Sequence, residues 1–158
     1  FIIIFAPMYA WMWVALAKRN LNPATPAKFA VGLMILALGF LVMVGAANVV
    51  AAGHQTFPTW LFFTYLFHTL GELALSPVGL SATTKLAPKR YVGQMMGIWF
   101  LGAALGNVVA GLLAGEFDAE NVASMPGQYL QIVLTTGGAG LILLLFTKPI
   151  KKLMGGIE

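Results

Sequence analysis

Three polar side chains stand at helical spacing inside an otherwise apolar stretch of the chain. His68, Glu72 and Ser76 occur four residues apart within the segment HTLGELALSP. Side chains at positions i, i+4 and i+8 lie on one face of an α-helix. Such a stripe can bind a charged or polar solute by ion pairing and hydrogen bonding, so the spacing predicts one wall of a water-filled cavity.

Glu72 occupies the most unusual position of the three. It is the only acidic residue within an apolar segment, and it lies almost midway between Pro58 and Lys85, about 20 Å of helix from each. A carboxylate near the centre of a bilayer costs about 3 kcal/mol and usually faces a bundle interior or a wet cavity. We therefore predict that Glu72 binds solute; a neutral Glu72 hydrogen-bonded to a neighbouring helix is the structural alternative. His68 is predicted as its polar neighbour, and His54 lies too far away to complete a metal site.

Two further residues accompany this stripe. Pro77 removes one helical N–H and crowds the carbonyl of Leu73, so a bend is expected there, either static or acting in gating. We predict a hinge. Trp99 lies at a depth similar to that of Ser76 on an antiparallel neighbour, deeper than the interfacial belt that tryptophan favours. Its ring is predicted to line the cavity, with a packed tryptophan as the alternative.

The composition indicates which elements must hold these residues. The chain has 158 residues, of which 59% are hydrophobic and 9% are charged, whereas a soluble domain carries about 25% charged residues. This predicts an all-α membrane protein. The apolar segments have, or nearly have, the roughly 20 residues that a bilayer requires. We place five transmembrane helices at residues 1–17, 29–52, 59–84, 92–114 and 128–147.

The basic residues occur in alternate connectors. All nine Lys and Arg residues follow the first, third or fifth apolar segment, whereas the connector after the fourth holds Glu116, Asp118 and Glu120. Because basic connectors stay on the cytoplasmic side, the N-terminus of the chain is predicted outside and the C-terminus inside. The net charge of +4 is thus explained by topology, and no nucleic-acid surface is predicted.

The sequence gives little support to an enzyme. It has no cysteine, no Gly-rich phosphate loop and no convincing nucleophile–base pair, so neither catalytic residues nor a cofactor is predicted. In the fourth segment, the pairs Gly93/Gly97 and Gly102/Gly106 predict close helix approach. The chain begins FIIIFAPMYA, without an initiating Met, and is expected to be a piece of a longer protein.

Two motifs together resemble a known family. GELALSPVGLSATTKLAP and MMGIWFLGAALGNVVAG are similar to the signature of the proton-dependent oligopeptide transporters, a branch of the major facilitator superfamily. The five segments resemble the last five of that family's twelve helices, which implies a fragment of a twelve-helix fold. The short connector GHQTFP, where animal relatives carry a large insert, resembles a bacterial member and implies the bacterial inner membrane.

The resemblance implies a function and a role for each candidate residue. The family takes up di- and tripeptides, with the proton as coupling ion, by alternating access of two six-helix halves. By resemblance, Glu72 meets the amino end of the peptide or a lysine of the opposite half, Ser76 lines the pocket and Trp99 walls the side-chain site. The bend at Pro77 would serve the cytoplasmic gate.

The same resemblance implies the partners. They are a di- or tripeptide, the lipid bilayer and the N-terminal half of the transporter, where the family holds its acidic–arginine cluster for proton coupling. A transporter of the same fold for nitrate or an amino acid is the nearest alternative. A membrane enzyme would need a second ionisable group or a metal facing Glu72, and a structural subunit would bind no ligand.

Overall fold

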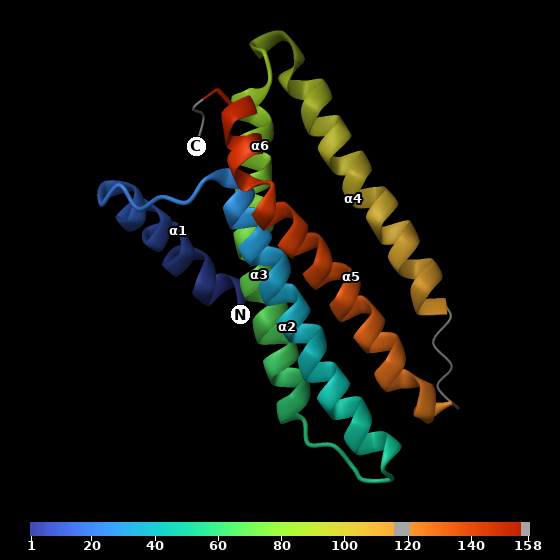
Figure 1. Ribbon diagram of the computed structural model, residues 1–158. Coiled ribbons are helices and arrows are strands. Elements are labelled where there is room, and N and C mark those ends of the chain that lie inside the picture. Colours follow the sequence, from blue (N-terminus) through green and yellow to red (C-terminus); the bar gives the residue numbers. More distant parts are fainter. Residues whose placement is uncertain (116–120, 156–158) are drawn as a thin grey trace.

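The computed structural model describes residues 1–115 and 121–155, which are largely helical and contain no strand (Figure 1). The helices in these ranges are α1 Ile2–Lys18, α2 Thr25–Ala51, α3 Thr59–Leu86, α4 Val92–Gly115, α5 Met125–Leu145 and α6 Thr147–Leu153. Short 3₁₀ turns at Lys89–Tyr91 and Val122–Ser124 precede α4 and α5. The acidic connector residues Glu116, Asp118 and Glu120 lie outside the described residues.

Each predicted segment corresponds to one of the helices α1 to α5, with ends that differ by a few residues. α2 begins at Thr25 rather than at residue 29, because Pro26 suits the first turn of a helix, where its missing N–H has no intrahelical partner to lose. α5 begins at Met125 in the same way, with a proline in its first turn. It ends at Leu145, and the basic tail continues as the separate helix α6.

Three helical stretches of the described chain are long and apolar enough to cross a membrane: Thr25–Ala51, Lys89–Gly115 and Val122–Leu145. α1 is apolar but shorter, with 17 residues. α3 has 28 residues, which is about 42 Å of helix. It is less apolar than its neighbours because it carries His68, Glu72 and several hydroxyl side chains. The polar stripe that drew attention to α3 therefore also weakens its signal as a membrane span.

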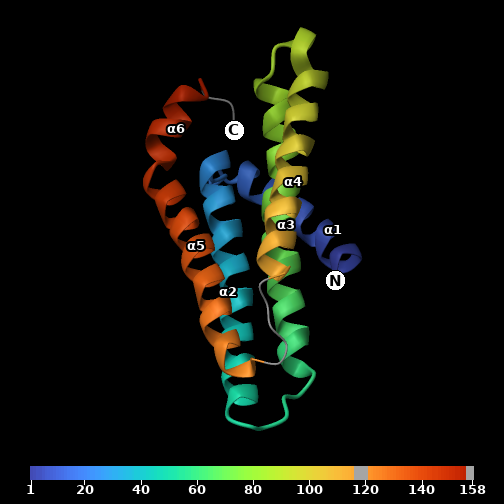
Figure 2. The same cartoon turned by 90° about the vertical axis from the view of Figure 1, so that its right-hand side faces the viewer.

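α2 lies at the centre of the bundle, between α3 and α5 (Figures 1 and 2). The buried hydrophobic residues of the described chain are mostly small: Ala30, Ala37, Ala46, Ala47, Leu73 and Ala74. Small residues let helix backbones approach closely. Helices in a lipid bilayer associate through such close packing, because the lipid tails are as apolar as the side chains. The core is thus a set of close backbone contacts along α2, which fixes the position of α3.

α4 packs much less closely than α2 or α3. It joins α3 at their shared end and diverges from it along its length (Figure 1), and none of its residues is buried. The pairs Gly93/Gly97 and Gly102/Gly106 were predicted to make close helix contacts. In the described part of the chain, a Cβ atom added at any of these four glycines would meet no atom within 4 Å. These four glycines therefore make no close helix contact within the described part of the chain.

Candidate functional site

Glu72 and Ser76 lie on the face of α3 that points away from α2. Both residues are exposed, whereas Gly71, Leu73 and Ala74 are buried. Glu72 makes no hydrogen bond or ion pair with other described residues. The arrangement leaves the carboxylate available to an ammonium group that approaches this face.

A close crossing of two backbones holds α3 in this orientation. A Cβ atom on Gly71 would lie 2.9 Å from the carbonyl oxygen of Gly32, and one on Gly32 would lie 3.1 Å from the carbonyl oxygen of Gly71. Only glycine leaves room for backbones at this separation. Because Gly71 directly precedes Glu72, the crossing determines which way the carboxylate points.

His68 does not continue the exposed stripe. Its ring lies against α2, with its centroid 4.6 Å from that of Phe40 and its edge over Gly39, and its Nε2 is buried without a hydrogen-bond partner among the described residues. The reason is geometric: at 3.6 residues per turn, each four-residue step rotates the side chain by about 40°. His68 is therefore turned toward α2, while Glu72 and Ser76 are exposed.

Pro77 is accommodated without interrupting α3, which runs from Thr59 to Leu86. The proline is exposed and lies between two glycines that contact other helices. Gly71 meets α2 before it, and Gly79 meets Trp99 after it. A bend at Pro77 would therefore move one contact relative to the other. The hinge itself stays a prediction.

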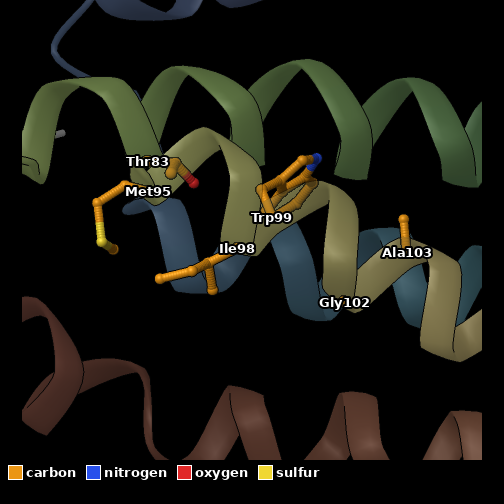
Figure 3. Close-up of a pocket in the computed structure, with 6 residues that line it drawn as sticks. All are labelled: Thr83, Met95, Ile98, Trp99, Gly102 and Ala103. Carbon is orange, nitrogen blue, oxygen red and sulfur yellow. The ribbon is translucent and has the colours of Figure 1, made fainter. Parts of the chain in front are cut away.

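Trp99 joins three helices. Its ring extends from α4 toward α3 (Figure 3) and covers Gly79, where an added Cβ atom would collide with it. The ring of Phe29 from α2 meets Trp99 edge to face, with centroids 6.3 Å apart and an interplanar angle of 83°. Aromatic pairs in this geometry contribute about 0.5–1.5 kcal/mol beyond the area that they bury. Trp99 is thus packed on one side of its ring.

The same tryptophan also lines an open hollow of about 420 Å³ between α3 and α4. Its walls are largely apolar, and the lining residues are Thr83, Met95, Ile98, Trp99, Gly102 and Ala103 (Figure 3). The Thr83 hydroxyl donates a hydrogen bond to the Gly79 carbonyl oxygen at 2.8 Å, which occupies its proton within the helix. The hollow can therefore take an apolar group, with a hydroxyl oxygen as acceptor at its edge.

Glu72 and Ser76 do not line this hollow, so the described helices do not bring all three candidate residues into one pocket. Sequence analysis missed Thr83, which does line it. Thr83 follows Ser76 by seven residues, a spacing that places two side chains on the same side of a helix. This spacing could have indicated Thr83 as a further pocket residue. The candidate site thus has two parts, a carboxylate on the exposed face of α3 and an apolar hollow beside Trp99.

These apolar helices define a multi-pass membrane protein that has one charged side chain exposed midway along α3. Comparison with known proteins identifies its family. The sequence model of the POT family matches residues 1–132. The chain belongs to the POT family, which confirms the resemblance carried by the motifs of α3 and α4.

Two relatives illustrate the similarity. The peptide transporter YePEPT of Yersinia enterocolitica is 40% identical over 160 residues, which cover 100% of this chain and 31% of the relative. A di-/tripeptide transporter of Lactococcus lactis is 33% identical over 159 residues, again 100% of this chain and 31% of the relative. The chain therefore spans 31% of the length of these relatives.

Solved structures confirm the fold class, a helical part of a larger transporter. A mutant peptide transporter POT in complex with alafosfalin superposes with a TM-score of 0.85 at 40% identity, over 98% of this chain and 31% of that one. A POT family transporter in complex with 5-aminolevulinic acid superposes with a TM-score of 0.81 at 29% identity, over 95% of this chain and 30% of that one.

Proposed function

We propose that this chain is part of a proton-coupled symporter that carries di- and tripeptides into the cell by alternating access. The proposal is supported by membership of the POT family and by relatives that are named as peptide transporters. The observation that carries it within the chain is the exposed Glu72 on α3. An ionised carboxylate midway along a membrane helix costs free energy. Its presence on an exposed face of α3 therefore suits the binding of a charged solute.

In the proposed mechanism, Glu72 pairs with a cation of the protein when no peptide is bound. The ammonium group of an entering peptide replaces that cation as its partner. This exchange shifts the balance between outward- and inward-facing states, because only a difference in affinity between two states can move their equilibrium. Ser76 lies one turn from Glu72 on the same exposed face and would hydrogen-bond to the bound peptide.

The hollow beside Trp99 would receive a peptide side chain. Its largely apolar lining suits side chains of varied size, because apolar contact has no directional requirement. Proton coupling would depend on acidic and basic groups in the rest of the transporter, with the proton as the coupling ion and no other cofactor. The protein would lie in the bacterial inner membrane, with its basic connectors in the cytoplasm.

The test uses the full-length transporter that contains this segment, reconstituted into liposomes. We expect a labelled dipeptide to accumulate under an inward proton gradient, and a protonophore to abolish the accumulation. Unlabelled di- and tripeptides should compete with the label. Accumulation that a protonophore leaves unchanged would contradict proton coupling, and failure of unlabelled peptides to compete would contradict the substrate class.

A second candidate is a transporter of the same fold for another small solute, such as an amino acid or nitrate. It is favoured by one comparison, the POT family transporter solved in complex with 5-aminolevulinic acid. The same liposomes separate the two functions. If a labelled amino acid or labelled nitrate accumulates in these liposomes and the labelled dipeptide does not, the second candidate replaces the first.

A further inference from the structure

The basic stretch that follows α5 forms a helix of its own. α6 (Thr147–Leu153) begins after the single residue Phe146 and runs in a different direction from α5 (Figures 1 and 2). Pro149 gives the physical reason. It has no N–H to bond to the carbonyl of Leu145, and its ring crowds that carbonyl, but it suits the first turn of a new helix. The proline thus separates a short basic helix from the membrane-spanning one.

The side chains of α6 separate into a basic side and an apolar side. The basic side carries lysines at spacings of three and four residues, Lys148, Lys151 and Lys152. The apolar side begins at the residue before the helix and has the same kind of spacing, with Phe146, Ile150 and Leu153. Residues three and four apart are neighbours on a helix surface, so each set forms one strip. This pattern is typical of segments that lie along a membrane surface.

Part of the apolar side remains uncovered by the described helices. α6 contacts α2, and Ile150 is half-buried. Leu153, by contrast, is 87% exposed, and Phe146 is 57% exposed. Topology accounts for lysines on one side of the membrane, but it does not account for large apolar side chains exposed beside them. Together, the two kinds of side chain match a surface that offers both hydrocarbon and negative charge.

The position of α6 places it where a membrane offers both. The stretch Val122–Leu145 is long and apolar enough to cross a membrane, and α6 begins two residues after it. The acyl layer therefore ends close to Phe146, and the headgroups lie at the level of α6. Lys148 and Lys152 are exposed, and the long side chain of lysine can reach lipid phosphates from a nearby helix. Lys151 takes part in an interaction within the chain and is not needed for this contact.

We propose that α6 lies on the membrane surface and binds anionic phospholipids. Lys148 and Lys152 meet the phosphate groups. Phe146 and Leu153 insert at the edge of the acyl layer, where their apolar surface leaves water. Because each basic residue near an anionic leaflet adds to the attraction, the site favours anionic over zwitterionic headgroups. The contact also fixes the level at which α5 leaves the membrane.

The test measures lipid binding beside α6 in the full-length transporter, in mixed vesicles of phosphatidylglycerol and phosphatidylcholine. A fluorophore on Lys151→Cys, in a background without other cysteines, is quenched by whichever lipid carries bromine on its acyl chains. Vesicles in which one or the other lipid is brominated give the relative affinity of this site for phosphatidylglycerol. We expect the site to favour phosphatidylglycerol, and Lys148→Gln/Lys152→Gln to lower the relative affinity at least about fivefold. High salt should also lower it, because exposed charges are screened.

The matched control removes two charges elsewhere. Lys18 and Arg19 are exposed and belong to another basic connector, so Lys18→Gln/Arg19→Gln should leave the relative affinity at α6 nearly unchanged. An equal loss in the two double variants would show that only the total charge matters and would overturn the proposal. So would a preference for phosphatidylglycerol that Lys148→Gln/Lys152→Gln leaves intact.

Leu153→Asn tests the apolar side. Because Leu153 is exposed, the substitution should not impair folding, and it should reduce quenching by both brominated lipids as α6 withdraws from the acyl layer. Lower thermal stability with unchanged quenching would mean that another part of the transporter covers Leu153. A dimer that Leu153→Asn dissociates, again with unchanged quenching, would assign this surface to a second copy. Either result overturns the proposal.

Discussion

At the scale of single residues, the charge of Glu72 can be tested separately from its size. Glu72→Gln keeps the shape of the side chain and removes the charge, so a peptide ammonium would lose its ion pair. Because a hydrogen bond to a charged group contributes about 1.5–3 kcal/mol, we expect peptide uptake to fall at least about tenfold. Initial uptake rates and peptide affinities in liposomes with matched protein content measure this.

The control for this substitution is Glu72→Asp, which keeps the charge one methylene further back and should retain part of the uptake. Matched amounts of folded protein in the membrane exclude a failure of insertion. If Glu72→Gln transports at the unmodified rate and with unmodified affinity, the proposed role of the carboxylate is wrong.

The contact between Gly79 and Trp99 gives a second prediction at this scale. A methyl group on Gly79 would collide with the rings of Trp99 and Phe29, so Gly79→Ala should lower the free energy of unfolding by about 1–3 kcal/mol. In a Trp99→Ala background, where the obstructing ring is absent, Gly79→Ala should cost less stability than it does in the unmodified protein. Thermal unfolding of the full-length protein measures the difference between the variants.

Gly138 of α5 provides the matched control, because a Cβ atom there would meet nothing within 4 Å. Gly138→Ala should leave stability unchanged or raise it slightly, since alanine favours a helix by about 0.5–1 kcal/mol over glycine. Equal destabilisation by Gly79→Ala and Gly138→Ala would show that the ring contact is not the cause.

At the scale of elements, α3 is attached on both sides of its proline. Gly71 crosses α2 before Pro77, and Gly79 receives Trp99 of α4 after it. Pro77→Ala would restore an N–H able to bond to the carbonyl of Leu73, and so make bending of α3 more costly. We expect slower exchange between outward- and inward-facing states with nearly unchanged peptide affinity.

Distances between spin labels placed on either side of the membrane report this exchange. Pro58→Ala is the control, because Pro58 precedes the first turn of α3 and its replacement restores no hydrogen bond inside the helix. Interconversion at an unaltered rate in Pro77→Ala would count against the hinge.

The elements themselves were largely predictable because each depends on local sequence. Apolar runs predicted the five long helices. The apolar run alone placed the start of α2 at residue 29, four residues late, because the polar first turn with Pro26 at its start precedes that run. Contacts between helices were not predictable in this way. The contact of Trp99 with Gly79, and the rotation of His68 onto Gly39, depend on how α3 lies against its neighbours.

At the scale of the whole molecule, two features have a common explanation: the exposed carboxylate of Glu72, and the glycines of α4 that contact no other helix. The chain spans 31% of the length of its relatives, and the faces that carry these residues are uncovered in the described helices. Within a complete transporter, such faces can border the solute pathway or another helix. The sequence predicted that Glu72 lies midway along a membrane span. What surrounds its exposed carboxylate could not be predicted, because it depends on the other helices of the complete transporter.

The topology of the molecule is the last property that can be tested, and the charge pattern makes the prediction specific. Basic connectors are retained in the cytoplasm, which places Lys89 inside and His54 outside. In a full-length background without other cysteines, a membrane-impermeant thiol reagent applied to intact cells should label His54→Cys and leave Lys89→Cys unlabelled. Permeabilising the membrane should expose the second site.

Both positions are exposed in the structure and lie at opposite ends of α3, so a difference in labelling reports the side of the membrane and not burial. If Lys89→Cys is labelled in intact cells and His54→Cys is not, the orientation is reversed. Glu72 would keep its place in either orientation, because a residue in the middle of a span has the same depth from either side.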